Sequence, residues 1–71
     1  MSLDEWLWEQ RMLNHEFADL TGFTQAMVTR LRKGQVIPRA DTVAIVEEIT
    51  NGAVKAADMV AAYRAKHGET A

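Results

Sequence analysis

The residues best suited to contact a ligand lie in one short stretch, from Thr24 to Lys33. It combines amide, hydroxyl, guanidinium and ammonium groups with two small side chains that end in methyl groups. A Gln side chain can pair with adenine N6 and N7, an Arg side chain with guanine O6 and N7, and Ala or Thr methyl groups can contact the thymine methyl. These residue types are therefore suited to reading base edges in the major groove of double-stranded DNA.

The spacing of these residues predicts that they share one side of a helix. Five polar or small residues lie opposite the apolar side chains of this helix: Gln25, Ala26, Thr29, Arg30 and Lys33. Val28 and Leu31 mark the apolar side, which would pack inward. The residues expected to contact bases are Gln25, Ala26, Thr29 and Arg30. Thr24 and Lys33, at the two ends of the helix, are expected to contact phosphates. The competing interpretation is a polar helix face that is merely solvated.

Charge is distributed unevenly along the chain, whose formal net charge is −2. All ten acidic residues lie outside residues 20–40, and four of the eight Lys and Arg lie within them, so that window carries +4 and the rest of the chain −6. This pattern permits a basic face on an acidic body, which suits docking on a polyanion. Arg39, near the end of the window, is expected to contact phosphate.

The elements that must position these residues are predicted to be five short helices. Glycine, proline and capping residues separate stretches with helical periodicity, at about 3–11, 14–21, 24–33, 38–50 and 56–67. No alternation of period two occurs, so no strand is expected. The predicted fold class is all-α, a compact five-helix domain over residues 1–67 with a frayed tail at 68–71. The expected core residues are Leu7, Phe17, Ala18, Leu20, Val28, Leu31, Val46 and Ile49.

Three positions leave alternatives open. Leu13 cannot cap the second helix with its side chain, so either the cap is poor or Asn14 caps a helix one residue shorter. Arg39, where a serine cap would be favourable, puts the start of the fourth helix in doubt. Trp8 lies off the apolar stripe of the first helix, so it either covers a neighbouring helix or a partner subunit, or is exposed without a function.

Other function classes find little support in the sequence. There is no cysteine, and His15 and His67 are too far apart in the chain to suggest a zinc site, so no metal or other cofactor is expected. The adjacent acidic pairs diverge around a helix, and the single serine is a helix cap, so no enzyme is predicted. No apolar run approaches the roughly 20 residues of a membrane span. The expected location is the cytoplasm of a bacterial or phage-infected cell.

Three residues have the spacing typical of a helix-turn-helix. Ala18 is small enough for two helices to cross closely, Gly22 can adopt the positive φ of the turn, and Val28 can fill the space between the helices. Asn14, at the start of the first of these helices, is expected to face a phosphate, because free backbone N–H groups there attract anions.

The stretch 12–54 resembles the Cro and phage-repressor-like, or XRE-type, family of transcriptional regulators. The matching residues are Phe17-Ala18, Gly22-Phe23-Thr24-Gln25, Val28-Thr29, Gly34, Pro38, Glu47, Thr50 and Gly52-Ala53-Val54. The resemblance implies a lambda-repressor-like fold and a small repressor that binds palindromic operators as a homodimer, with one recognition helix of each subunit in the major groove. The rival hypothesis is a helix-turn-helix scaffold that binds another protein, as an anti-activator or adaptor.

Overall fold

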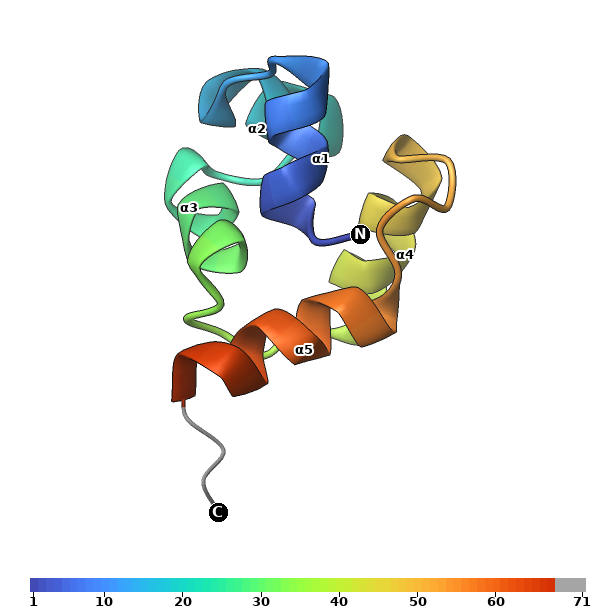
Figure 1. Cartoon of the computed structure of the whole chain (residues 1–71). Coiled ribbons are helices and arrows are strands. Elements are labelled where there is room, and N and C mark those ends of the chain that lie inside the picture. The colour runs from blue at the N-terminus through green and yellow to red at the C-terminus, as the bar shows by residue number, and fades with distance from the viewer. Residues whose placement is uncertain (68–71) are drawn as a thin grey trace.

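The computed structural model describes residues 1–67, which form five α-helices and no strand (Figure 1). The helices are α1 (Leu3–Gln10), α2 (Asn14–Thr21), α3 (Gln25–Lys33), α4 (Ala40–Ile49) and α5 (Ala56–His67). This confirms the predicted all-α, five-helix class. The predicted frayed tail at 68–71 lies outside the described residues. No helix within residues 1–67 has the length and apolar character needed to cross a membrane.

The helices surround one apolar core. In Figure 1, α1 and α2 lie at one end, α5 runs across the other end, and α3 and α4 stand on opposite sides between them. The α3 helix contacts α1, α2 and α5, while α4 contacts α2 and α5. The central position of α3 in these contacts leaves only part of its surface free.

Side chains from all five helices and one loop form this core. The buried apolar residues are Leu3, Leu7, Phe17, Ala18, Val28, Leu31, Val46, Val54 and Met59. Of the predicted core residues, Ile49 is only partly buried against this cluster. Leu20 is 56% exposed, so its predicted burial was wrong. The reason is angular: the buried side of α2 is centred between Phe17 and Ala18, and Leu20 lies roughly 110° from that centre at 100° per residue.

Acidic side chains complete the starts of α1 and α2, whereas α4 lacks a side-chain cap. Ser2 and Glu5 form a reciprocal capping box at α1. At α2 the cap position belongs to Leu13, whose backbone N–H donates to Glu16 Oε1 at 2.7 Å. Asn14 is therefore the first helical residue and not a cap, and Glu16 partly compensates for the apolar cap. Arg39 precedes α4 without a side-chain cap bond, and the helix begins at Ala40, two residues after the predicted start at Pro38.

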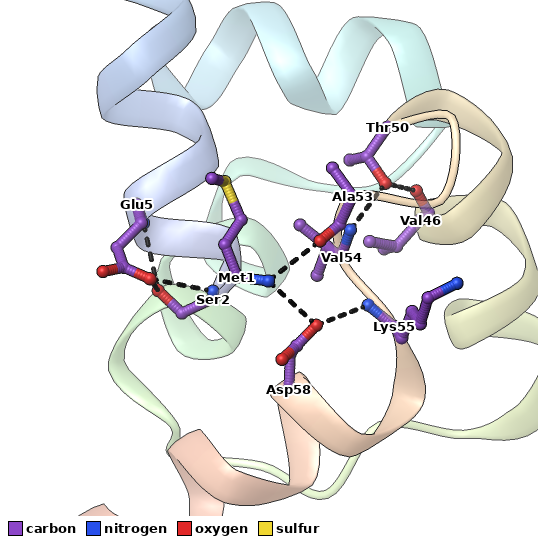
Figure 2. Close-up of polar contacts among 9 residues, drawn as sticks. All are labelled: Met1, Ser2, Glu5, Val46, Thr50, Ala53, Val54, Lys55 and Asp58. Atoms are coloured by element: carbon purple, nitrogen blue, oxygen red, sulfur yellow. Dashed lines mark hydrogen bonds and ion pairs between the residues drawn. The ribbon is translucent and has the colours of Figure 1, made fainter.

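The start of α5 also anchors the beginning of the chain (Figure 2). Asp58 Oδ2 accepts hydrogen bonds from the backbone N–H of Lys55 at 2.9 Å and from the amino group of Met1 at 3.1 Å. The same amino group donates to the carbonyl oxygen of Ala53 at 3.0 Å. The hydrogen bond from Lys55, followed by the one from the amino group, holds the pKa of Asp58 below its ordinary value.

Replacing Asp58 by asparagine is expected to lower the free energy of unfolding at pH 7 by about 0.3–1 kcal/mol, because a carboxylate near a helix N-terminus is favourable but solvent screens it. A carboxyl group whose pKa is lowered by folding stabilises the protein at pH values above its unfolded-state pKa. This stabilisation is lost as the pH falls through its folded-state pKa. The difference between Asp58→Asn and wild type should therefore shrink in acid. Urea unfolding between pH 7 and pH 3 measures it, with Asp19→Asn as control. A difference that does not change with pH would contradict the prediction.

Candidate nucleic-acid interface

A three-residue turn, residues 22–24, joins α2 to α3. Gly22 has φ +83°, the left-handed conformation that closes a helix, and its N–H donates to Ala18 O at 2.8 Å. Thr24 Oγ1 then accepts a hydrogen bond from the N–H of Met27 at 3.0 Å and caps α3. The predicted turn glycine and the predicted cap are both confirmed. The turn therefore sets the direction in which α3 leaves α2.

The apolar side of α3 is packed against the rest of the domain. Val28 is fully buried and Leu31 is 7% exposed. Ala18 on α2 is 6% exposed, and α2 and α3 are in direct contact. A small residue at this position allows the two helices to approach closely. This packing determines which side of α3 faces solvent.

The opposite side of α3 is polar and open. Gln25, Ala26, Arg30 and Lys33 are exposed, whereas Thr29 is partly buried. Within residues 1–67, the side chains of Gln25, Arg30 and Lys33 make no hydrogen bond or ion pair. The helix contains no acidic residue, and its last turn carries Arg30, Arg32 and Lys33. The structure thus presents together the four residues predicted to contact bases, with Lys33 beside them.

The other residues predicted to contact phosphate lie in different surroundings. Thr24 and Arg39 are exposed at the starts of α3 and α4. Asn14 is partly buried, and both ends of its amide have partners: Nδ2 donates to Thr29 Oγ1 at 2.9 Å, and Oδ1 accepts from Arg32 Nη1 at 2.6 Å. Contacts of these residues with DNA remain predictions.

Arg32 has a structural role that the sequence analysis did not assign. Its Nε and Nη2 atoms each lie 2.7 Å from Asp4 Oδ1 on α1, and its side chain is 18% exposed. Arg32 therefore links α3 to α1 through Asp4 and to α2 through Asn14. The one available signal was its place four residues after Val28, at the border between the buried and exposed sides of α3.

Trp8 lies beside Arg32 at the surface. Its side chain is 71% exposed, and the guanidinium carbon of Arg32 lies 6.0 Å from the centre of its ring. A hollow of about 400 Å³ adjoins the ring and is lined by Leu7, Trp8, Arg11, Met12, Leu13 and Arg32. Trp8 therefore covers part of Arg32 on the neighbouring helix α3, while most of its ring faces solvent.

Acidic and histidine side chains do not gather elsewhere in the described part of the chain. Residues 1–67 contain no group of three or more His, Asp or Glu side chains arranged to hold a metal ion. Most of the predicted site residues, by contrast, lie on the polar side of α3.

Comparison of the chain with protein-family models, curated proteins and solved structures found no significant match.

Proposed function

We propose that this protein binds double-stranded DNA sequence-specifically and acts as a small transcriptional regulator of the repressor type. In this proposal α2, the turn at 22–24 and α3 form a helix-turn-helix, and α3 enters the major groove. The observation that carries the proposal is the exposed side of α3. There Gln25, Arg30 and Lys33 have no partner within residues 1–67, while the opposite side of the helix is buried.

Some residues on this surface are suited to reading DNA bases, and others to contacting the DNA backbone. Gln25 and Arg30 carry groups that can form two hydrogen bonds with one base, and Ala26 and Thr29 supply methyl groups for thymine. Thr24, Lys33 and Arg39 offer hydroxyl and cationic groups for phosphates. The acidic residues all lie outside 20–40, which favours docking by this surface over docking by the rest of the molecule.

The resemblance of residues 12–54 to XRE-type regulators supports the same function and suggests that the protein binds DNA as a homodimer. Regulators of that family bind two-fold operators as homodimers, so two copies of α3 would enter successive major grooves about one helical turn apart. Asn14 belongs to this proposal through its position at the start of α2, whose free N–H groups suit a phosphate.

Selection from a library of random duplexes tests the function. Enrichment of a palindromic site is expected, and titration of one such duplex should saturate at two protein chains. Saturation at one chain, with full affinity for a half-site, would refute the dimer. Failure to enrich any sequence would refute sequence-specific binding. A duplex of scrambled sequence at the same salt concentration is the control, because non-specific affinity depends strongly on salt.

A second candidate function is recognition of another protein by the surface around Trp8. The observation that favours it is the exposed ring next to the hollow formed with Arg11 and Leu13. A large exposed aromatic side chain beside a hollow is typical of interaction sites. NMR titration separates the candidates: DNA binding should shift the amide signals of α3, whereas the second function predicts that DNA leaves α3 unchanged and a protein partner shifts the Trp8 indole signal.

A further inference from the structure

We propose that Asp4, Arg32 and Asn14 form a positioning relay that makes the Thr29 hydroxyl a hydrogen-bond donor toward DNA, an inference that rests on the proposed function. The relay runs through three helices, from Asp4 on α1 to Arg32 on α3, to Asn14 on α2 and back to Thr29 on α3. Each of its hydrogen bonds is between 2.6 and 2.9 Å long. None of the three positioning residues needs to touch a base itself.

The chemistry of each residue sets the direction of the relay. A carboxylate only accepts hydrogen bonds and a guanidinium only donates them, so Arg32 must donate to Asp4. Arg32 also faces Asn14, and the amide atom on that side must therefore be the oxygen. The amide nitrogen is then left to face Thr29, whose oxygen accepts its hydrogen bond. Arg32 thus determines the orientation of an amide that could otherwise flip.

The consequence appears at Thr29. Its oxygen accepts from Asn14, and within residues 1–67 its hydroxyl proton is donated to no acceptor. Thr29 lies between the exposed side of α3 and the side packed against α2, so the proton is available at the edge of the reading surface. In the major groove it suits an acceptor such as guanine O6 or N7, or thymine O4, and not the amino group of cytosine.

Asn14→Asp tests the relay because it changes polarity with little change in shape. The carboxylate still accepts from Arg32, so the domain should keep its fold and its thermal unfolding. Toward Thr29, however, it offers an acceptor. The hydroxyl would then donate inward and present only lone pairs to DNA. At one position per half-site, the preference for acceptor-bearing over amino-bearing bases should fall about fivefold, the equivalent of one hydrogen bond.

The added negative charge will also weaken binding to every duplex, so the readout is base preference and not affinity. The control is the same change in a Thr29→Val background, which removes the hydroxyl and keeps the shape. In that background Asn14→Asp should leave base preference unchanged. Thr29→Val alone should lose discrimination at the same position. If it keeps every base preference, the relay is refuted even where Asn14→Asp fails to fold.

The outcomes separate this inference from the proposed function. If the wild-type protein enriches no duplex sequence, the proposed function fails. If the wild type selects a site and Asn14→Asp keeps every base preference, the relay is refuted while DNA binding stands. A change of preference that is equally large in the Thr29→Val background would also refute it, because Asn14 would then act without Thr29.

Discussion

Gly34→Ala is expected to lower the free energy of unfolding by about 2–5 kcal/mol, a large share of the stability of a domain this small. Gly34 closes α3 with φ +71°, where an alanine is strained by about 1–2 kcal/mol. A Cβ atom there would also overlap the backbone carbonyl of Ala62 on α5. Since a backbone atom cannot rotate away, α5 must shift, which adds an overpacking cost of about 1–3 kcal/mol.

Gly22→Ala is the matched control for this prediction. Gly22 has a similar φ, +83°, and no atom lies within 4 Å of the position that its Cβ would occupy. It should therefore show the backbone strain alone. Thermal and urea unfolding of both variants measure the difference, and the melting temperature should fall by roughly 10–40 °C for Gly34→Ala. Equal destabilisation of the two variants would contradict the proposed clash with α5.

The largest functional effects are expected from alanine substitutions on the open side of α3. Gln25→Ala or Arg30→Ala should each weaken binding to the selected site by about 1–3 kcal/mol, which is roughly 5- to 150-fold, and relax the choice of base at one position per half-site. Lys33→Ala should instead weaken binding to all duplexes alike. It should also flatten the dependence of log affinity on log salt concentration by about one unit per lost phosphate contact.

Lys55→Ala is the control for the loss of a positive charge. Lys55 directly precedes α5, and the start of α5 lies across the domain from α3 in Figure 1, so this substitution should leave binding unchanged. Competition titrations with selected and random duplexes at several salt concentrations separate the two kinds of effect. If all three α3 variants bind both duplexes as the wild type does, α3 is not the reading helix, and protein recognition around Trp8 becomes the better account.

Several features of this protein follow from local sequence alone. The helix bounds were predictable within about two residues because their signals are local: Ser2 and Thr24 cap helices, and Gly22 and Gly34 close them with positive φ. The open side of α3 was predictable for the same reason. Once Val28 and Leu31 are buried, helical geometry alone places Gln25 and Arg30 on the other side.

Tertiary structure alone decided the features that depend on distant partners. Val54 is fully buried although it lies in a loop, where no periodicity announces burial. Arg32 contacts Asp4, which lies 28 positions earlier in the chain, and Asn14, which lies 18 positions earlier. No local pattern contains contacts between residues this far apart. Gly34 combines a feature set by local sequence with one set by tertiary packing. Its positive φ follows from ending a helix, but the lack of room for any side chain follows from the approach of Ala62, which only the packing of α5 against α3 creates.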